Sequence, residues 1–227
     1  MHYNKLKDYV YEYITDQINK GDIQQGERIT EEELCQKMGL SRTPIREAFI
    51  ELASEGMLIA KPRKGYIVNI LTCKRTQDLY EVMGLLEGYI AFTVVDLLTE
   101  ADYQEMEEAI RQMDEAVENK NAKAVDIAND KFHYCFTRHC INEELVYDAD
   151  RIRRLFARQS LPFERNPSAY QALVTSNSHH KVILELFKKH KKKEIQDYFQ
   201  SVHWSKESPI FKVINNLSDC PATKESG

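Results

Sequence analysis

The chain has 227 residues, of which 42% are hydrophobic and 30% are charged, with only 8 Gly and 6 Pro. This composition excludes a collagen-like, low-complexity or disordered chain and supplies enough apolar material for one large or two small folded domains. The formal net charge of −5 excludes a general polycation, so any contact with nucleic acid must come from a local basic patch.

No apolar stretch is long enough and free enough of charge to span a membrane, and the opening residues MHYNKLKDYV contain no apolar signal segment. We therefore expect a cytoplasmic protein that does not contact membranes. The number of cysteines is odd and their spacing is uneven, which predicts free thiols rather than a disulfide framework. They are Cys35, Cys73, Cys135, Cys140 and Cys220.

The first forty residues predict two helices. The first is amphipathic and stops before Gly21. The second opens with the capping-box pair Thr30 and Glu33 and closes at Gly39. The apolar positions of the first helix recur at helical spacing: Leu6, Val10, Tyr13, Ile14 and Ile18.

A third helix and a hairpin are predicted next. The helix begins with Ser41 as its N-cap, or with Thr43 as the cap and a proline at the first helical position. Two short extended runs, 57–60 and 66–70, flank the sequence KPRKG and predict a hairpin whose turn ends on Gly65. The order helix, helix, short turn, helix, hairpin is typical of a winged helix-turn-helix.

The rest of the chain predicts an antiparallel bundle of helices, so the protein as a whole is mainly α. We expect a winged helix over 1–72, a polar linker over 73–78, a helical domain over 79–217 and a frayed tail over 218–227. Inward apolar stripes are predicted at Leu79, Val82, Leu86 and Ile90, and at Met106, Ile110, Met113 and Val117. Further helices are predicted over 122–137, 142–159, 167–189 and 192–206, with a last short segment that ends near Leu217.

Two arginines lie four residues apart at the start of the predicted third helix. Arg42 and Arg46 share the face opposite the apolar side chains of that helix. A helix N-terminus that presents two guanidinium groups suits the phosphates and guanine edges of a DNA major groove. The turn adds Lys61, Arg63 and Lys64. The alternative is a solvated helix face with an ordinary charged turn, and the order of the elements favours DNA contact.

The run GDIQQGERITEEELCQKMGLSRTPIREAFIELASEGML, followed by the basic turn, resembles the winged helix of GntR-type bacterial transcription regulators. The resemblance implies that Arg42, Thr43 and Arg46 contact bases or phosphates, and that Gly65 lets the wing approach DNA closely. Many relatives carry a DNA-contacting arginine in the second helix where this chain has Glu32. That contact is therefore not carried over.

The helical region holds a candidate metal site. Asn129 and His133 lie four residues apart and project from one helical face, while His180 and His203 lie in two later helices. Three imidazoles and one amide oxygen suit Zn²⁺ or a similar metal if the fold brings them together. The alternative is that each histidine is separately buried or exposed.

The region from Leu79 to Trp204 resembles the helical FCD ligand-binding domain of the FadR branch of the same family. The resemblance implies a divalent metal, most favourably Zn²⁺ with Ni²⁺ or another metal as the alternative. The positions that match the metal ligands are Asn129, His133, His180 and His203.

The chain departs from the FCD pattern at two positions. Asn129 stands where Asp is common, which removes a negative charge from the metal site. Met83 stands where many members carry an arginine that pairs with a carboxylate effector. Either the effector is not a simple dicarboxylate or the anchoring role passes to other arginines. The candidates are Arg153, Arg154 and Arg158, and the alternative for each is a solvated surface side chain.

Other histidines are expected to play lesser parts. We place His179 at the surface or in an outer layer around the metal site, and we expect the run KKHKKKE around His190 to form an exposed turn between helices. Cys135 and His139 form an i, i+4 pair that could bind a metal only as a weakly favoured alternative.

The sequence therefore predicts a homodimeric regulator that binds double-stranded operator DNA and senses a small carboxylate through a metal-containing bundle. Two alternatives remain. A zinc-dependent hydrolase or lyase would use the same three histidines but needs a general base, and no paired acids stand at suitable spacing. A helical interaction module without metal would use none of them.

Overall fold

The computed structural model describes residues 2–20, 22–69, 72–157 and 167–217. The chain divides into two compact units. The first comprises Met1–Ile70 with Arg154–Ser160, and the second comprises Leu71–Arg153 with Leu161–Gly227. The expected tail at 218–227 lies outside the described residues.

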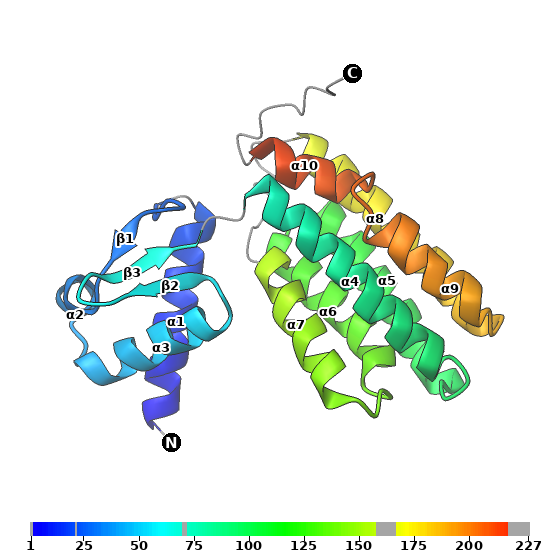
Figure 1. The fold of residues 1–227 in the computed structure, drawn as a ribbon, viewed down its shortest axis with the longest axis horizontal. Helices are drawn as coiled ribbons and strands as arrows, with labels where there is room; N and C mark the ends of the chain where they lie inside the picture. Colours follow the sequence, from blue (N-terminus) through cyan, green and yellow to red (C-terminus); the bar gives the residue numbers. More distant parts are fainter. Residues whose placement is uncertain (1, 21, 70–71, 158–166, 218–227) are drawn as a thin grey trace. The chain divides into compact units, whose positions relative to one another are not determined.

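The first unit is the predicted winged helix-turn-helix. It combines three helices with a three-stranded antiparallel sheet of order β1-β3-β2. In the hairpin formed by β2 and β3, Leu58 lies opposite Val68 and Lys61 lies opposite Gly65. Its elements, in chain order, are α1 (His2–Lys20), β1 (Arg28–Ile29), α2 (Glu31–Met38), α3 (Arg42–Ser54), β2 (Leu58–Lys61) and β3 (Gly65–Val68) (Figure 1).

Local signals set the ends of these elements. Thr30 and Glu33 form the predicted capping box of α2, and Gly39 closes the helix with a φ of 66°. Ser41 is the N-cap of α3, which decides between the two predicted starts. The two-residue β1 strand was not predicted, because so short a run carries no periodicity. The predicted apolar face of α3 is fully buried: Ile45, Ala48, Phe49 and Leu52.

The second unit is wholly helical in its described residues (Figure 1). Its α5 packs against α6 and α8, while α4 packs against α6, α9 and η1. The predicted stripe of α5 from Met106 to Val117 is buried as expected. The elements are α4 (Cys73–Val94), α5 (Glu100–Glu118), α6 (Ala122–Thr137), α7 (Glu143–Ala157), α8 (Pro167–Lys188), α9 (Lys192–Tyr198), the π-helix η1 (Phe199–His203) and α10 (Pro209–Leu217).

Residues 73–78 form the first turns of α4 instead of the expected linker. The side chain of Thr72 accepts a hydrogen bond from the backbone N–H of Arg75 and so caps the helix. Lys74 and Asp78 then form an i, i+4 ion pair on its exposed surface. The polar composition that suggested a linker therefore belongs to a capped, solvated helix start.

The predicted inward stripe of α4 is wrong at Val82. That side chain is 39% exposed, whereas Met83, Glu87 and Ala91 are fully buried. Helix α4 carries apolar side chains on two faces, so its 3.6-residue period does not say which face is inward. The exposed apolar face consists of Val82, Leu85, Tyr89 and Phe92.

The cysteines follow the expectation only in part. Cys35, Cys135 and Cys140 are free thiols, but Cys73 is disulfide-bonded, so the prediction of free thiols throughout is wrong at Cys73. No helix in the described ranges is long and apolar enough to cross a membrane.

Gly65 should tolerate alanine worse than Gly39, because both residues have positive φ but only Gly65 is crowded. A Cβ on Gly65 would lie 2.8 Å from the backbone oxygen of Ile29, whereas one on Gly39 meets nothing within 4 Å. We expect Gly39→Ala to lower the free energy of unfolding by about 1 kcal/mol and Gly65→Ala by about 3 kcal/mol. Chemical denaturation of both variants checks this, and equal losses would contradict the packing of β3 on β1.

Candidate functional site

The start of α3 presents a basic, unpaired surface. Arg42, Thr43 and Arg46 are exposed, and neither arginine has a side-chain partner in the described part of the chain. One acid of the same helix is held elsewhere, because Glu51 pairs with Lys7 at 2.9 Å within the first unit. The guanidinium groups of α3 are therefore available to an anionic ligand.

The turn of the hairpin is equally exposed. Lys64 donates its backbone N–H to the oxygen of Lys61 at 2.9 Å, which closes a four-residue turn over Pro62 and Arg63. Arg63 has a φ of 62°, a left-handed conformation that favours glycine or asparagine. An arginine at this position places a cationic side chain at the tip of the wing at a conformational cost. The side chains of Lys61, Arg63 and Lys64 are all exposed.

The packing of the sheet explains why position 65 is a glycine. Its close neighbours are the backbone of Ile29 and the side chain of Thr30, so the glycine admits β1 next to β3. The close approach to DNA implied by the resemblance stays a prediction.

Three of the four predicted metal ligands converge in the second unit. His133 of α6, His180 of α8 and His203 of η1 place one nitrogen each within 4.8 Å of the others. Their side chains are at most 7% exposed. The rings of His180 and His203 are 4.9 Å apart, and each lies 5.3–5.4 Å from the ring of His133. No other cluster of this kind occurs among the described residues.

Two glycines of α4 let η1 and α9 approach this centre. A Cβ on Gly84 would lie 3.0 Å from the Cα of Gln200, and one on Gly88 would lie 3.0 Å from the backbone oxygen of Gln196. Larger residues at these positions would push η1 and α9 outward. The predicted helix 192–206 is not uniform. It changes to a π-helix at Phe199, and this wider turn carries His203. Single π turns of this kind occur often at functional sites.

Each of the three clustered histidines has at least one buried nitrogen without a hydrogen-bond partner among the described residues. Nε2 of His180 and Nδ1 of His203 are buried without a hydrogen bond among the described residues. Nδ1 of His180 lies 3.3 Å from Oδ1 of Asn177, an oxygen that only accepts, so this nitrogen carries the proton and Nε2 keeps its lone pair. Asn177 is itself fixed, because its amide donates to Asp114 and to the backbone of Ile110.

Burial also favours the form of histidine that binds metals. It lowers the pKa of all three imidazoles well below the usual value, and the positive charge of Arg153 lowers that of His133 further. Neutral imidazoles with free lone pairs, buried in the helical unit, are the donor set of a structural or catalytic zinc site. The three histidines therefore fit a divalent metal.

Sequence reasoning missed Glu87, a fully buried acid of α4. Its Oε1 accepts from Nη1 of Arg153 at 2.5 Å and lies 2.9 Å from Nδ1 of His133. The second contact has the distance of an ion pair but not the angle of a hydrogen bond. Oε2 accepts from Nε1 of Trp204 at 2.6 Å. Burial raises the pKa of Glu87, and Arg153 opposes that shift. The sequence did contain one indication of its position: Glu87 lies four residues after Met83 and therefore on the same helical face.

The candidate effector arginines differ in their surroundings. Arg153 is 5% exposed and already bound to Glu87, Asp130 and Asp150, so an incoming carboxylate would compete with three internal ones. Arg154 is partly exposed at the end of α7, and Arg158 lies outside the described residues. Their roles stay predictions.

The remaining candidates take secondary positions. Asn129 lies one turn before His133 on α6 and is partly buried, and its role as a fourth ligand stays a prediction. His179 is partly buried with its ring 6.0 Å from that of His203, in keeping with an outer layer. His190 lies in an exposed turn with a φ of 53° and pairs with Asp96.

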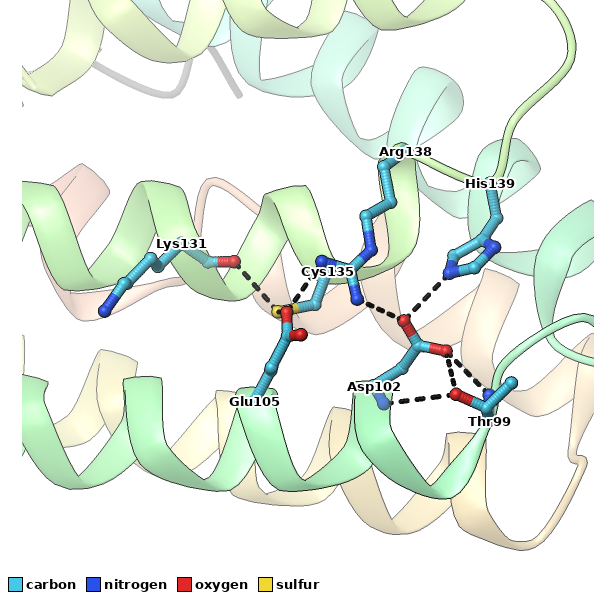
Figure 2. A network of polar contacts seen from close by, with 7 residues as sticks. All are labelled: Thr99, Asp102, Glu105, Lys131, Cys135, Arg138 and His139. Atoms are coloured by element: carbon cyan, nitrogen blue, oxygen red, sulfur yellow. Dashed lines mark hydrogen bonds and ion pairs between the residues drawn. The ribbon is translucent and has the colours of Figure 1, made fainter.

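The alternative pair Cys135 and His139 binds different partners (Figure 2). The thiol contacts Glu105 and the backbone oxygen of Lys131, while the imidazole contacts Asp102 at 2.8 Å. Burial raises the pKa of the Cys135 thiol to about 11, so it is not a thiolate. Asp102 also accepts from Arg138 and from Thr99, and this network joins the start of α5 to the end of α6.

Family models match both units. Residues 6–68 match the model for bacterial regulatory proteins of the gntR family, and residues 78–201 match the model for the FCD domain. The chain belongs to the gntR family of bacterial regulators, in its FCD-containing form.

Proteins similar to this chain are transcriptional regulators by name. The chain is 32% identical over 132 residues to YdhC of Bacillus subtilis, covering 58% of this chain and 55% of that protein. It is 31% identical over 137 residues to the Nta operon transcriptional regulator of Aminobacter aminovorans, covering 59% and 64%. The chain thus spans about 55–64% of the length of these relatives.

Solved structures of other proteins share the fold. A regulator from Rhodococcus sp. RHA1 aligns with a TM-score of 0.67 at 18% identity, covering 95% of this chain and 99% of that one. McbR/YncC of Escherichia coli aligns with a TM-score of 0.63 at 19% identity, covering 93% and 94%. The family and these relatives are regulators rather than enzymes, so the hydrolase alternative is set aside.

Asp126, two turns before His133 on the same face of α6, should make stability depend on pH. Burial raises the pKa of its carboxyl to about 7, and Asp130 adds repulsion. Because this pKa is raised, the folded state binds the proton more tightly than the unfolded chain, and stability falls as pH rises from about 4 to 7. We expect Asp126→Asn to be more stable than the parent by roughly 1–3 kcal/mol at pH 8.

Urea denaturation at pH 8 and pH 4 checks this expectation. The advantage of the asparagine should largely vanish at pH 4, where the Asp126 carboxyl of the folded protein is protonated and neutral. An equal advantage at both pH values would show that titration of Asp126 is not its cause.

Proposed function

We propose that this protein is a transcription regulator that binds double-stranded operator DNA through its winged helix. The observation that supports this most strongly is the exposed, unpaired set of Arg42, Thr43 and Arg46 at the start of α3. The three cations of the hairpin turn lie in the same unit and would contact the backbone or the minor groove. Membership of the gntR family supports the same function.

Two substitutions should separate base reading from backbone contact. Arg46→Ala should weaken binding by about 1–3 kcal/mol and relax preference at one base position. Lys64→Ala should weaken binding alike on all sequences and reduce the salt slope by about one. The measurement is fluorescence anisotropy at several salt concentrations, with duplexes selected by the parent protein from a random library.

Lys193→Ala provides the control, because this lysine is exposed on α9, outside the winged helix. The assignment of α3 fails if Arg46→Ala binds the selected duplexes as tightly as the control does.

We infer that the histidine centre holds a divalent metal, with Zn²⁺ as the best match to three imidazoles. His133, His180 and His203 would bind it, and Asn129 would supply an oxygen. Once bound, such a metal offers open coordination positions to a small anionic effector such as a carboxylate. Because Arg153 is held by three acids, the metal would be the main anchor for that carboxylate.

We also propose that the regulator is a homodimer. Val82, Leu85, Tyr89 and Phe92 are 36–55% exposed and follow the 3-4-3 spacing of a helix seam. A second copy that covers this face of α4 would supply the second winged helix of a two-fold operator complex. Effector binding would shift the spacing of the two winged helices, and a coupling of about 1–3 kcal/mol would change operator affinity roughly 5–150-fold.

Loss of metal is expected when one of the clustered histidines is removed. The parent protein should hold about one Zn²⁺ per chain after dialysis, and His133→Ala and His180→Ala should lose most of it. His190→Asn is the control, because His190 lies in an exposed turn and asparagine tolerates its positive φ. Elemental analysis by plasma mass spectrometry measures all four proteins. Equal metal content in all of them would refute the assignment.

A further inference from the structure

We propose that Glu87 is the positioning residue of the histidine centre. It would not bind the metal itself but would orient His133 and, through Trp204, hold the segment that carries His203. This inference rests on the proposed metal function.

Both oxygens of Glu87 are already in use. Oε1 contacts Arg153 and His133, and Oε2 accepts from Trp204, all within 2.9 Å. Of the described acids, none belongs to the group whose ligand atoms all lie within 4.8 Å of one another. Glu87 therefore lies beside the ligands and not among them.

Contact with a carboxylate suits His133 as a ligand. An imidazole that directs one nitrogen toward a carboxylate presents the other, more basic nitrogen to the metal. His180 instead makes a hydrogen bond through its Nδ1 to a neutral oxygen, that of Asn177, at 3.3 Å. Of the two buried oxygens that lie beside these rings, that of Glu87 belongs to a side chain that also binds Arg153 and Trp204, so its loss should change the centre more.

Glu87 also fixes the position of His203 relative to α4. Trp204 follows His203 directly, and its indole N–H donates to Oε2 of Glu87. Gly84 lies three residues before Glu87, and Gly88 follows it directly. These glycines bring α4 against Gln200 and Gln196. One hydrogen bond and two close backbone contacts thus set where η1 places its histidine.

Arg153 keeps Glu87 in place. The guanidinium is nearly buried and bridges Glu87 to Asp130 of α6 and to Asp150 of its own helix. A carboxylate fixed in this way holds one rotamer, and that rotamer is needed for it to orient two neighbours at once.

The test compares Glu87→Gln with Asp102→Asn. Asp102 is also a buried carboxylate that contacts an arginine and a histidine, but its histidine is His139, outside the centre (Figure 2). Zn²⁺ affinity is measured by competition with a chromophoric chelator, and the Co²⁺-loaded proteins are compared by their visible absorption bands. We expect Glu87→Gln to bind Zn²⁺ about 10–100-fold more weakly with altered Co²⁺ bands, and Asp102→Asn to match the parent in both.

Trp204→Phe keeps the ring and removes the N–H, so it should also weaken Zn²⁺ binding, and it decides the matter if Glu87→Gln does not fold. If Glu87→Gln folds and keeps the Zn²⁺ affinity and Co²⁺ bands of the parent, the inference is overturned. If Glu87→Gln does not fold, the same result in Trp204→Phe overturns it. Equal losses in Asp102→Asn and Glu87→Gln would also overturn it, because they would reflect general destabilisation. A parent protein that binds neither metal would instead reject the proposed metal centre.

Discussion

The second unit depends on how its buried imidazole nitrogens are satisfied. A buried polar atom without a partner costs about 1–3 kcal/mol. The imidazole nitrogens left without one in the described residues lie on His133, His180 and His203, the three residues that converge. Asn177 pairs with Nδ1 of His180, and Glu87 lies beside Nδ1 of His133. A cation at the point of convergence would remove the cost at all three rings together, and this is the physical reason for proposing a metal there.

The packing that creates this point is local and specific. Glycines at positions 84 and 88 of α4 admit η1 and α9, and the π turn brings His203 to the same side as His133 and His180. The winged helix has its own counterpart in Gly65, which admits β1 beside β3. In both units, residues without a side chain set the distance between elements that carry the functional groups.

Much of this was predictable from the sequence, because the signals are local. The Thr30–Glu33 capping box, Gly39 and the apolar face of α3 gave the winged helix, and the segment 122–137 matches α6 at both ends. The candidate ligands His133, His180 and His203 were found by their spacing and by resemblance, and their convergence required the fold. The inward face of α4 was misjudged because Glu87 interrupts the apolar pattern of the buried side.

Other features had no sequence signal of their own. A π turn differs from an α turn by one residue of hydrogen-bond register, which periodicity does not resolve at Phe199–His203. Glu87 resembled a surface acid, since its partners Arg153 and Trp204 are 66 and 117 residues away. Long-range pairs of this kind become visible only when the helices are packed.

The most direct measurement of the central claim is the X-ray absorption spectrum of the purified protein at the zinc edge. The account predicts a first coordination shell of nitrogen and oxygen at about 2.0–2.2 Å, with the outer-shell scattering of three imidazole rings. A protein without metal, or a shell that lacks imidazole scattering, would contradict it.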